Sequence, residues 1–247
     1  VNRSYAQAAE LNGKIYVVGG AVNADGNAAT GALWMYDPAA NTWGGNCAAV
    51  AAMPTPLRSH SATLLFDGRV LVAGGNDGFG EANVSYIYDP RVDTWTATDP
   101  TPLLEPRFNH TASLLPNGTV MITGGSQRFG DIPRSIETFH INASSWVTGV
   151  QFKAGPRAFH TMTLALNNRM YGIGGSDGVI GGIGVTLRSN VESGYFTSTP
   201  DGFSKGSPPS LRQSTVTTAS ASPFFLPGAH DRTVVGAPFR GGPEAAG

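Results

Sequence analysis

Three histidines and the arginines just before them are the residues whose types and spacing could do chemistry. Each histidine lies fourteen residues before the first glycine of a Gly-Gly pair: His60, His110 and His160. Tyr5 takes this slot before the first pair, and an arginine precedes each slot by two or three residues: Arg3, Arg58, Arg107 and Arg157. Grouped imidazoles can bind a metal ion, and guanidinium forks suit carboxylates. Tyr5, the three histidines, Arg58, Arg107 and Arg157 are therefore candidate binding residues.

The elements that must position these residues are short strands. Apolar runs end in the glycine pairs that begin at Gly19, Gly74, Gly124 and Gly174, at intervals of 55, 50 and 50 residues. Before each run stands a turn such as Asn12-Gly13, and before the turn another strand-like stretch. Asn-Gly and Asp-Gly between apolar runs are strong hairpin signals, since both turn residues need positive φ. Each unit therefore begins with a β-hairpin.

The pattern continues after each glycine pair. Stretches such as "LWMYDP" and "SYIYDP" indicate third strands, and the segments around Trp43, Trp95 and Trp146 indicate fourth strands. In the fourth unit Tyr195-Phe196 stands where tryptophan is expected. Each unit of about 50 residues is thus one four-stranded antiparallel sheet, too small to bury its faces without neighbours. A β-sandwich also has many short strands, but it does not explain a repeat carrying the same landmarks.

The glycine pair after an apolar strand, followed by Tyr and then Trp, resembles the kelch repeat. This resemblance implies an all-β, kelch-type β-propeller with one four-stranded blade per unit. The four blades are expected at about 1–50, 51–100, 101–150 and 151–196, followed by a Pro/Gly/Ser-rich linker or loop at 197–210 and a degenerate or partial fifth unit at 211–247. Because kelch propellers usually have six or seven blades, we expect missing blades or other chains to complete the ring, with a fragment as the simpler explanation.

In kelch propellers the first strand of a blade is the innermost, so the slot residues are expected around one mouth of the central channel. A residue that recurs with the fold is usually used by the fold. We therefore interpret His60, His110 and His160 mainly as blade residues, and the arginines as blade residues or as ligand-facing groups at the mouth.

The wording around "FNHTASLLPNGTVMITGG" is also similar to the propeller of galactose oxidase-like copper radical oxidases. That resemblance implies copper held by two tyrosines and two histidines, one tyrosine being cross-linked to a cysteine. Here Ser59, Asn109 and Phe159 stand where the tyrosine of a Tyr-His pair belongs, and nothing in the sequence supplies a tyrosine partner for the single cysteine, Cys47. Copper is accordingly an alternative in which the catalytic residues lie outside this chain or have been lost.

Composition excludes several function classes. Lys+Arg number 16 and Asp+Glu 17, and the basic residues are scattered, so nucleic acid is not an expected partner. The sequence has no apolar run of the roughly 18 residues that a membrane helix needs, and no signal peptide opens it, although a removed leader is left open. Hydrolase signatures and EF-hand spacing are also missing. Loops after the glycine pairs vary while the strands match, which is where binding specificity is usually found.

The sequence therefore predicts a non-enzymatic binding or scaffolding module without a cofactor, for a protein segment or a glycan at the channel mouth and loops. Asn-x-Ser/Thr sequons occur at Asn2 and at the glycosylation candidates Asn83, Asn109, Asn117 and Asn142. They favour an extracellular or cell-surface setting. A cytoplasmic setting is the alternative, because one cysteine gives no need for oxidising surroundings.

Overall fold

A computed structural model describes most of the first 204 residues of the chain. The described ranges are 3–23, 25–44, 50–98, 102–127, 131–151, 157–165, 169–176, 191–196 and 203–204. They belong to a compact unit that ends at Pro209, and Ser210–Gly247 form a second unit. The expected fifth unit at 211–247 lies outside the described residues. Within the described ranges every regular element is a β-strand, and no helix there could cross a membrane.

Sixteen strands in the described residues form four antiparallel sheets, each with its strands in chain order. The first sheet contains β1 (Gln7–Leu11), β2 (Lys14–Val18), β3 (Leu33–Asp37) and β4 (Thr42–Gly44). The second contains β5 (Ser61–Leu64), β6 (Val70–Ala73), β7 (Ser85–Asp89) and β8 (Thr94–Ala97). The third contains β9 (Thr111–Leu114), β10 (Val120–Thr123), β11 (Ser135–His140) and β12 (Ser145–Gln151). The fourth contains β13 (Thr161–Leu164), β14 (Arg169–Ile173), β15 (Val191–Phe196) and β16 (Phe203–Ser204). This all-β arrangement of four-stranded blades confirms the predicted fold class.

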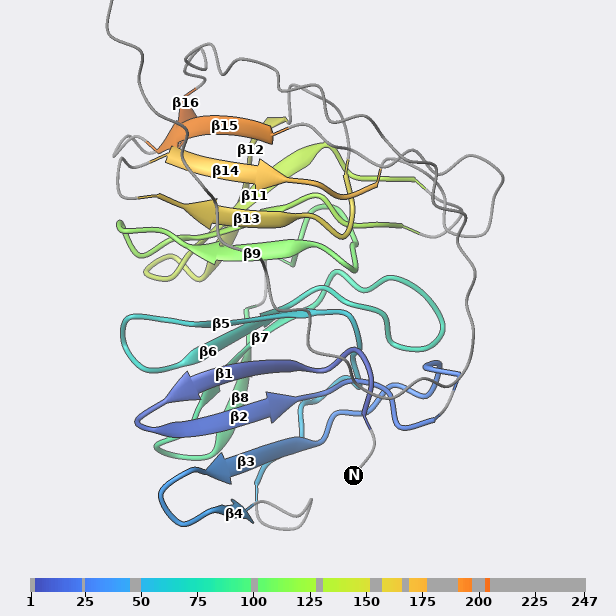
Figure 1. Cartoon of the computed structure of the whole chain (residues 1–247), viewed down its shortest axis with the longest axis vertical. Coiled ribbons are helices and arrows are strands. Elements are labelled where there is room, and N and C mark those ends of the chain that lie inside the picture. The colour runs from blue at the N-terminus through green and yellow to red at the C-terminus, as the bar shows by residue number, and fades with distance from the viewer. Residues whose placement is uncertain are drawn as a thin grey trace, which may run out of the picture. The chain divides into compact units, whose positions relative to one another are not determined.

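The first strands of successive sheets, β1, β5, β9 and β13, are neighbours in space (Figure 1). In the same view the hairpin turns β1–β2 and β5–β6 lie at one end of the blades, and the loops after the first two glycine pairs lie at the other end. We call the second end the loop end. The recurring slot residues enter the first strands at this loop end, because Arg58 and Phe108 form β-bridges with Asn76 and Ser126, directly after the glycine pairs.

The hydrophobic core lies between the sheets. Residues of the first two sheets, including Val18, Leu33, Val70 and Val72, form one cluster with Leu57 of the connection between them. A second cluster joins sheets two and three, and a third joins sheets three and four. Each sheet thus buries a face against each neighbouring sheet, as expected for units that are too small to fold alone.

The fourth sheet differs from the prediction for its aromatic pair. Tyr195 and Phe196 lie at the end of the third strand, β15, where Tyr195 pairs with Arg169 of β14, and the fourth strand is β16. The connection from β14 to β15 has 17 residues, whereas that from β6 to β7 has 11. This longer connection moves the third strand to the position at which the other units have their tryptophan.

One face of the first sheet shows what a blade needs from a neighbour. Arg3, Val17, Trp34 and Trp43 line a cavity of about 290 Å³ there, and Trp43 is 60% exposed. Its counterpart in the second sheet, Trp95, packs against the cluster that the first two sheets share. The two tryptophans have equivalent register, opposite Tyr36 and Tyr88. Completion of a ring at this face remains a prediction.

Candidate functional site

The backbone register at the loop end corrects the alignment of the first unit. Bridges to the residues after the glycine pairs place Ser4, Arg58, Phe108 and Ala158 in equivalent positions. Tyr5 is therefore equivalent to Ser59, and Ala6, not Tyr5, takes the histidine slot. The reason is the tight Asn12-Gly13 turn, which leaves Gln7 11 residues before its partner Val18, whereas Ser61 lies 12 residues before its partner Ala73. Counting back from the glycine pair thus shifts the first unit by one residue.

The same register separates Arg58 from the other arginines. Leu57, Arg107 and Arg157 are equivalent, because their carbonyl oxygens accept hydrogen bonds from Gly20, Gly75 and Gly125 of the preceding blades. In the first blade Arg3 precedes Ser4, so it takes this position as well. Leu57 therefore occupies the arginine position in the second blade, and Arg58 is one residue further on.

Arginines in the shared position bind carbonyl groups of their own blade. Nη1 of Arg3 donates to the Gly19 oxygen at 2.9 Å, and Nη1 of Arg107 donates to the Gly124 oxygen at 3.0 Å. Nη1 of Arg157 donates to the Gly174 oxygen at 3.2 Å. Both Arg107 and Arg157 are fully buried. These two binding candidates thus hold the turn after the second strand, and in this structure neither reaches the surface.

Arg107 also forms a buried ion pair with Glu137 of β11. Its Nη2 lies 2.7 Å from Oε1 of Glu137, and both side chains are inaccessible to solvent. Glu137 accepts two further hydrogen bonds, from the backbone N–H groups of Leu104 and Glu105. Burial lowers the pKa of the Arg107 guanidinium, while the neighbouring carboxylates of Glu137 and Glu105 raise it. Glu137 was not recognised in the sequence, where nothing distinguishes it from the scattered carboxylates.

Each slot histidine packs against the first glycine of the preceding blade's pair. A Cβ atom built on Gly19, Gly74 or Gly124 would lie 2.6, 2.8 or 2.6 Å from Cε1 of His60, His110 or His160. Nε2 of His110 is 3.0 Å from Ser61 Oγ, and Nε2 of His160 is 3.1 Å from Thr111 Oγ1. Burial lowers the pKa of His60 and His160 to about 4 and that of His110 to about 3, so the rings are neutral at pH 7. The geometry supports the interpretation of these histidines as residues that join blades.

A hydrogen-bonded backbone ladder crosses the four blades at the loop end. The backbone N–H of Ser59 donates to the carbonyl oxygen of Tyr5. In the same way Asn109 N–H donates to the Ser59 carbonyl and Phe159 N–H to the Asn109 carbonyl, with distances of 2.9 to 3.2 Å. All four residues have positive φ, between 53° and 57°. We call these residues, together with the described parts of the loops that follow the first three glycine pairs, the mouth. The ladder fixes one backbone conformation at the entry to every blade.

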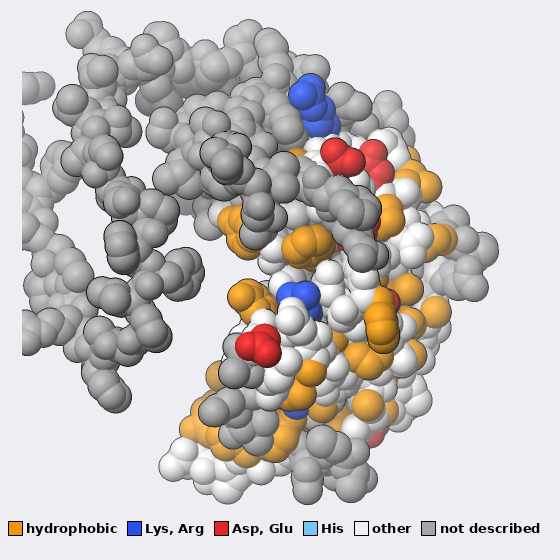
Figure 2. Space-filling model, turned by 90° about the vertical axis from the view of Figure 1, so that its right-hand side faces the viewer, with side chains coloured by type: hydrophobic (Ala, Val, Ile, Leu, Met, Phe, Trp, Pro, Cys, Tyr) orange, Lys and Arg blue, Asp and Glu red, His pale blue; other side chains and the backbone are white. Residues whose placement is uncertain are grey.

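The mouth exposes three large aromatic side chains beside smaller and polar ones such as Asn23, Asn27 and Asp131. Tyr5 is 55% exposed, Phe159 53% and Phe79, in the loop after the second glycine pair, 89%. Figure 2 views the molecule from the loop end and shows apolar side chains spread over the surface, with few acidic or basic ones among them. Phe79 was missed as a single residue, although its loop, "NDGFGEANV", belongs to the variable loops singled out in the sequence.

An inner cavity of about 260 Å³ lies beside the first strands. It is lined by Gln7, His60, Ser61, Ala62, His110, Thr111, Ala112, Thr161 and Met162. The lining comes from the first strands of all four sheets and from two of the slot histidines. Among the described residues no group of three or more His, Cys, Asp or Glu side chains is placed to hold a metal ion. Cys47 lies outside the described ranges.

The glycosylation candidates occupy different environments. Asn117 and Asn142 are exposed, whereas Asn83 and Asn109 are half-buried. Asn117 lies in the β9–β10 turn, where its Oδ1 accepts a hydrogen bond from Thr119 N–H at 3.0 Å. Asn109 is a member of the backbone ladder. Glycosylation at any of these residues remains a prediction.

The four-stranded blades, joined through glycine pairs and slot residues, define a kelch-repeat propeller domain. In agreement, a family model described as the KLHDC2/KLHL20/DRC7 Kelch-repeats domain matches residues 5–229. The chain belongs to this family, whose domains are typically protein-interaction modules. No curated protein matches the chain.

Proposed function

We propose that this chain is a non-enzymatic binding module that recognises a protein segment through the mouth. The observation that carries this proposal is the set of exposed aromatic side chains, Tyr5, Phe79 and Phe159, on a hydrogen-bonded backbone frame. Aromatic residues are enriched at protein interfaces, and Tyr is among the residues that most often form their energetic hot spots. A frame that is already ordered reduces the entropy lost on binding.

The loop that carries Phe79 is itself preorganised. Oδ1 of Asp77 accepts hydrogen bonds from Phe79 N–H at 2.8 Å and from Gly80 N–H at 2.9 Å. Oδ1 of Asn76 accepts one from Gly78 N–H at 2.9 Å. These short-range bonds order the turn, and the Phe79 side chain is 89% exposed. Exposure of a large apolar ring to water is unfavourable, and contact with a partner would remove this cost.

The candidate residues divide into two roles in this proposal. Arg107, Arg157 and the three slot histidines are buried and support the frame. Tyr5 is not in the histidine slot and Arg58 is not in the position of Arg107 and Arg157, and both lie at the mouth. A protein segment is the favoured partner because protein interaction is typical of the family; a glycan is the alternative outcome.

A peptide selection tests the proposed function. A displayed library of random twelve-residue peptides is selected on the purified chain, and the dissociation constants of the enriched peptides are measured for Phe79→Ala and Tyr5→Ala. We expect each variant to bind at least about tenfold more weakly, as for a moderate interface hot spot. Phe66→Ala is the matched control, since Phe66 is 71% exposed and lies in the β5–β6 turn at the opposite end.

The proposal fails if enriched peptides bind both mouth variants as tightly as the unchanged chain, or if no peptide is enriched. A glycan array probed in parallel shows whether the partner is a carbohydrate. If a glycan binds in a Phe79-dependent way and no peptide binds, the partner is a glycan and not a protein segment.

The copper radical oxidase alternative is a separate hypothesis with its own test. Metal analysis after incubation of the purified chain with copper and dialysis reports whether copper is retained in a one-to-one ratio. Retention that is lost in His110→Gln would favour a copper site. The module proposal expects no stoichiometric copper, because His110 already contacts Ser61 of the preceding blade.

We also propose that the chain acts outside the cell or at its surface, on the strength of its sequons. Asn142, in the exposed turn between β11 and β12, is the best placed acceptor. Expression in a secreting eukaryotic cell should give a glycan on Asn142 that Asn142→Gln removes. An unmodified Asn142 in such material would favour the cytoplasmic alternative.

A further inference from the structure

The side chain of Arg58 has no hydrogen-bond or ion-pair partner among the described residues. Its Nε is buried without a hydrogen-bond partner, and its side chain is half-buried. Its guanidinium carbon lies 6.0 Å from the centroid of the Tyr5 ring. By contrast, Arg3 and Arg107 donate to carbonyl groups of their own blades. The side chain of Arg58, one residue further along than the other arginines, therefore lies beside a Tyr ring and does not bind the carbonyl groups of its blade.

Arg58 lies between the backbone ladder and the loop of Phe79. It precedes Ser59 of the ladder, and it pairs through two backbone hydrogen bonds with Asn76, where that loop begins. Tyr5, on its other side, packs against the loop of the first blade at Gly26, and Asn27 of that loop approaches Gly78. A segment that contacts both the ladder and Phe79 would pass over Arg58.

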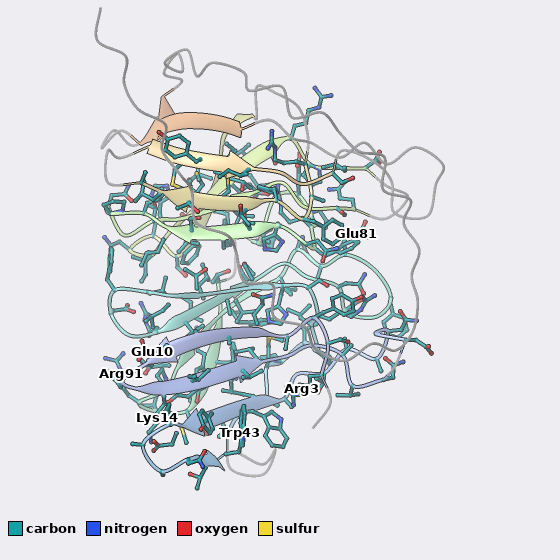
Figure 3. All side chains as sticks on the ribbon, in the orientation of Figure 1. Arg3, Glu10, Lys14, Trp43, Glu81 and Arg91 are labelled. Atoms are coloured by element: carbon teal, nitrogen blue, oxygen red, sulfur yellow. The ribbon has the colours of Figure 1, made fainter. Side chains whose placement is uncertain are left out.

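Glu81 is the nearest acidic group by backbone pairing. Asn76 bridges Arg58 on one side and Glu81 on the other, so the three residues form one small sheet. Figure 3 shows Glu81 at the loop end, away from Glu10, Lys14 and Arg91, which lie towards the hairpin turns. Oε2 of Glu81 is buried without a hydrogen-bond partner, and none of the ion pairs among the described residues joins Glu81 to Arg58. The Arg58 guanidinium thus has no carboxylate at ion-pair distance among the described residues, although Glu81 belongs to the same small sheet.

We propose that Arg58 binds an acidic side chain, Asp or Glu, within the protein segment that occupies the mouth, and that Tyr5 holds the guanidinium in place. This inference rests on the proposed function and adds a charge requirement to it. A partly desolvated guanidinium without a partner is satisfied best by a carboxylate, which accepts two parallel N–H bonds. An internal acidic residue fits better than a chain end, because the mouth continues past Arg58 on both sides.

In this arrangement the Tyr5 ring restricts the orientation of the Arg58 guanidinium. A ring next to the fork restricts its rotation and adds a cation–π contribution, so that less side-chain entropy is lost when the carboxylate binds. Tyr5 keeps φ at 57°, which is costly for a bulky residue. The backbone ladder stabilises this conformation, which presents the ring to the mouth.

The test uses the peptides enriched on the purified chain, each synthesised in three forms. One form is unchanged, a second has every Asp and Glu replaced by Asn and Gln, and a third has an amidated C-terminus. Dissociation constants are measured by fluorescence polarisation for the unchanged chain, Arg58→Gln and Arg58→Lys. We expect Arg58→Gln to weaken the unchanged peptides by roughly 10- to 100-fold, as for a lost charged hydrogen bond, and Arg58→Lys to weaken them less.

Two controls separate binding from folding and from general charge effects. Arg91→Gln removes an arginine at the opposite end and should leave affinity unchanged. Glu81→Gln removes a neighbouring negative charge and should leave affinity equal or somewhat higher. The melting temperature of Arg58→Gln should match that of the unchanged chain, because Arg58 donates no side-chain hydrogen bond within the blade. A large fall in melting temperature, comparable with that of Arg107→Gln, would assign Arg58 to the frame and overturn the proposal.

The outcomes distinguish this inference from the proposed function. If peptides bind through Phe79 but equally well to Arg58→Gln, the module stands and the carboxylate inference fails. If only C-terminal amidation weakens binding, the carboxylate comes from a chain end and the internal acidic residue is wrong. If Glu81→Gln weakens binding as much as Arg58→Gln, the partner carries a cationic group, and the inference is also overturned. If no peptide binds, both proposals fail.

Discussion

The imidazole of His110 packs on Gly74 of the preceding blade, so closely that a Cβ atom on Gly74 would lie 2.8 Å from Cε1 of the histidine. Gly74 also has φ of 60°, and the next residue, Gly75, donates its N–H to the Arg107 oxygen. His160 repeats the arrangement on Gly124. The glycine pair of one blade and the slot histidine of the next therefore pack together in one inter-blade contact, which we call the joint. This packing explains why the two features recur together.

Gly74→Ala should destabilise the chain by about 2–4 kcal/mol, since it combines an unfavourable φ with a clash in a packed joint. Its Cβ would also lie 2.6 Å from the Arg107 oxygen, which is backbone and cannot move alone. Gly80→Ala is the matched control, because Gly80 has no atom within 4 Å of its added Cβ and no positive φ. Urea denaturation measures both. Equal midpoints for the two variants would contradict the joint.

Acid should weaken the joints above the pH at which most carboxylates titrate. The folded pKa values of about 4, 3 and 4 for His60, His110 and His160 lie below the ordinary value of 6.5. Between pH 6.5 and about 4 the unfolded chain therefore binds more protons, so stability is complete above pH 6.5 and falls as the pH is lowered. Each histidine contributes up to about 1.4 kcal/mol per pH unit. Urea denaturation at several pH values should show a shallower slope for His110→Gln; an unchanged slope would contradict the burial of a neutral ring.

The Arg107–Glu137 pair should be strongly coupled. Glu137→Gln leaves a buried guanidinium without its counter-ion and should cost about 3–5 kcal/mol. Arg107→Leu with Glu137→Tyr imitates the second blade, where Leu57 and Tyr86 hold the equivalent positions. We expect the double variant to be more stable than the sum of the single effects predicts, with part of the loss remaining because Leu104 N–H loses its acceptor. Additive effects in a double-mutant cycle would show that the pair is not an energetic unit.

Most of the fold could be predicted because the landmarks of each blade are local. A hairpin turn such as Asn12-Gly13, whose two residues both have positive φ, an apolar strand and a glycine pair each specify a backbone geometry within a few residues. The register of Tyr5 could not be predicted by counting, since one residue fewer in a hairpin is invisible without the bridge between Ser4 and Ala21. The third-strand position of Tyr195 was missed for a similar reason, a longer connection before it.

The candidate site was predicted in part. Counting placed Arg58 and Arg107 in one group, because both precede a slot histidine. The backbone register separates them: Arg107 binds carbonyl groups of its own blade, whereas Arg58 lies at the mouth. Glu137 was beyond sequence reasoning, because its role depends on the backbone N–H groups of Leu104 and Glu105, which are distant in the chain. Phe79 at the mouth could be distinguished from a core residue only by its exposure in the structure.

Phe159 should limit stability while it serves binding. Its φ of 55° is unfavourable for a bulky residue, whereas Asn109 adopts the same conformation in the preceding blade at lower cost. Phe159→Asn should therefore raise the free energy of unfolding by about 0.5–1 kcal/mol, because the exposed ring contributes little packing. The same variant should weaken mouth-binding peptides, since it removes one of the three exposed aromatic rings of the mouth. Thermal unfolding and fluorescence polarisation on the same preparation measure both effects. A loss of stability would place the ring in the frame, and unchanged affinity would limit the binding surface to the first two blades.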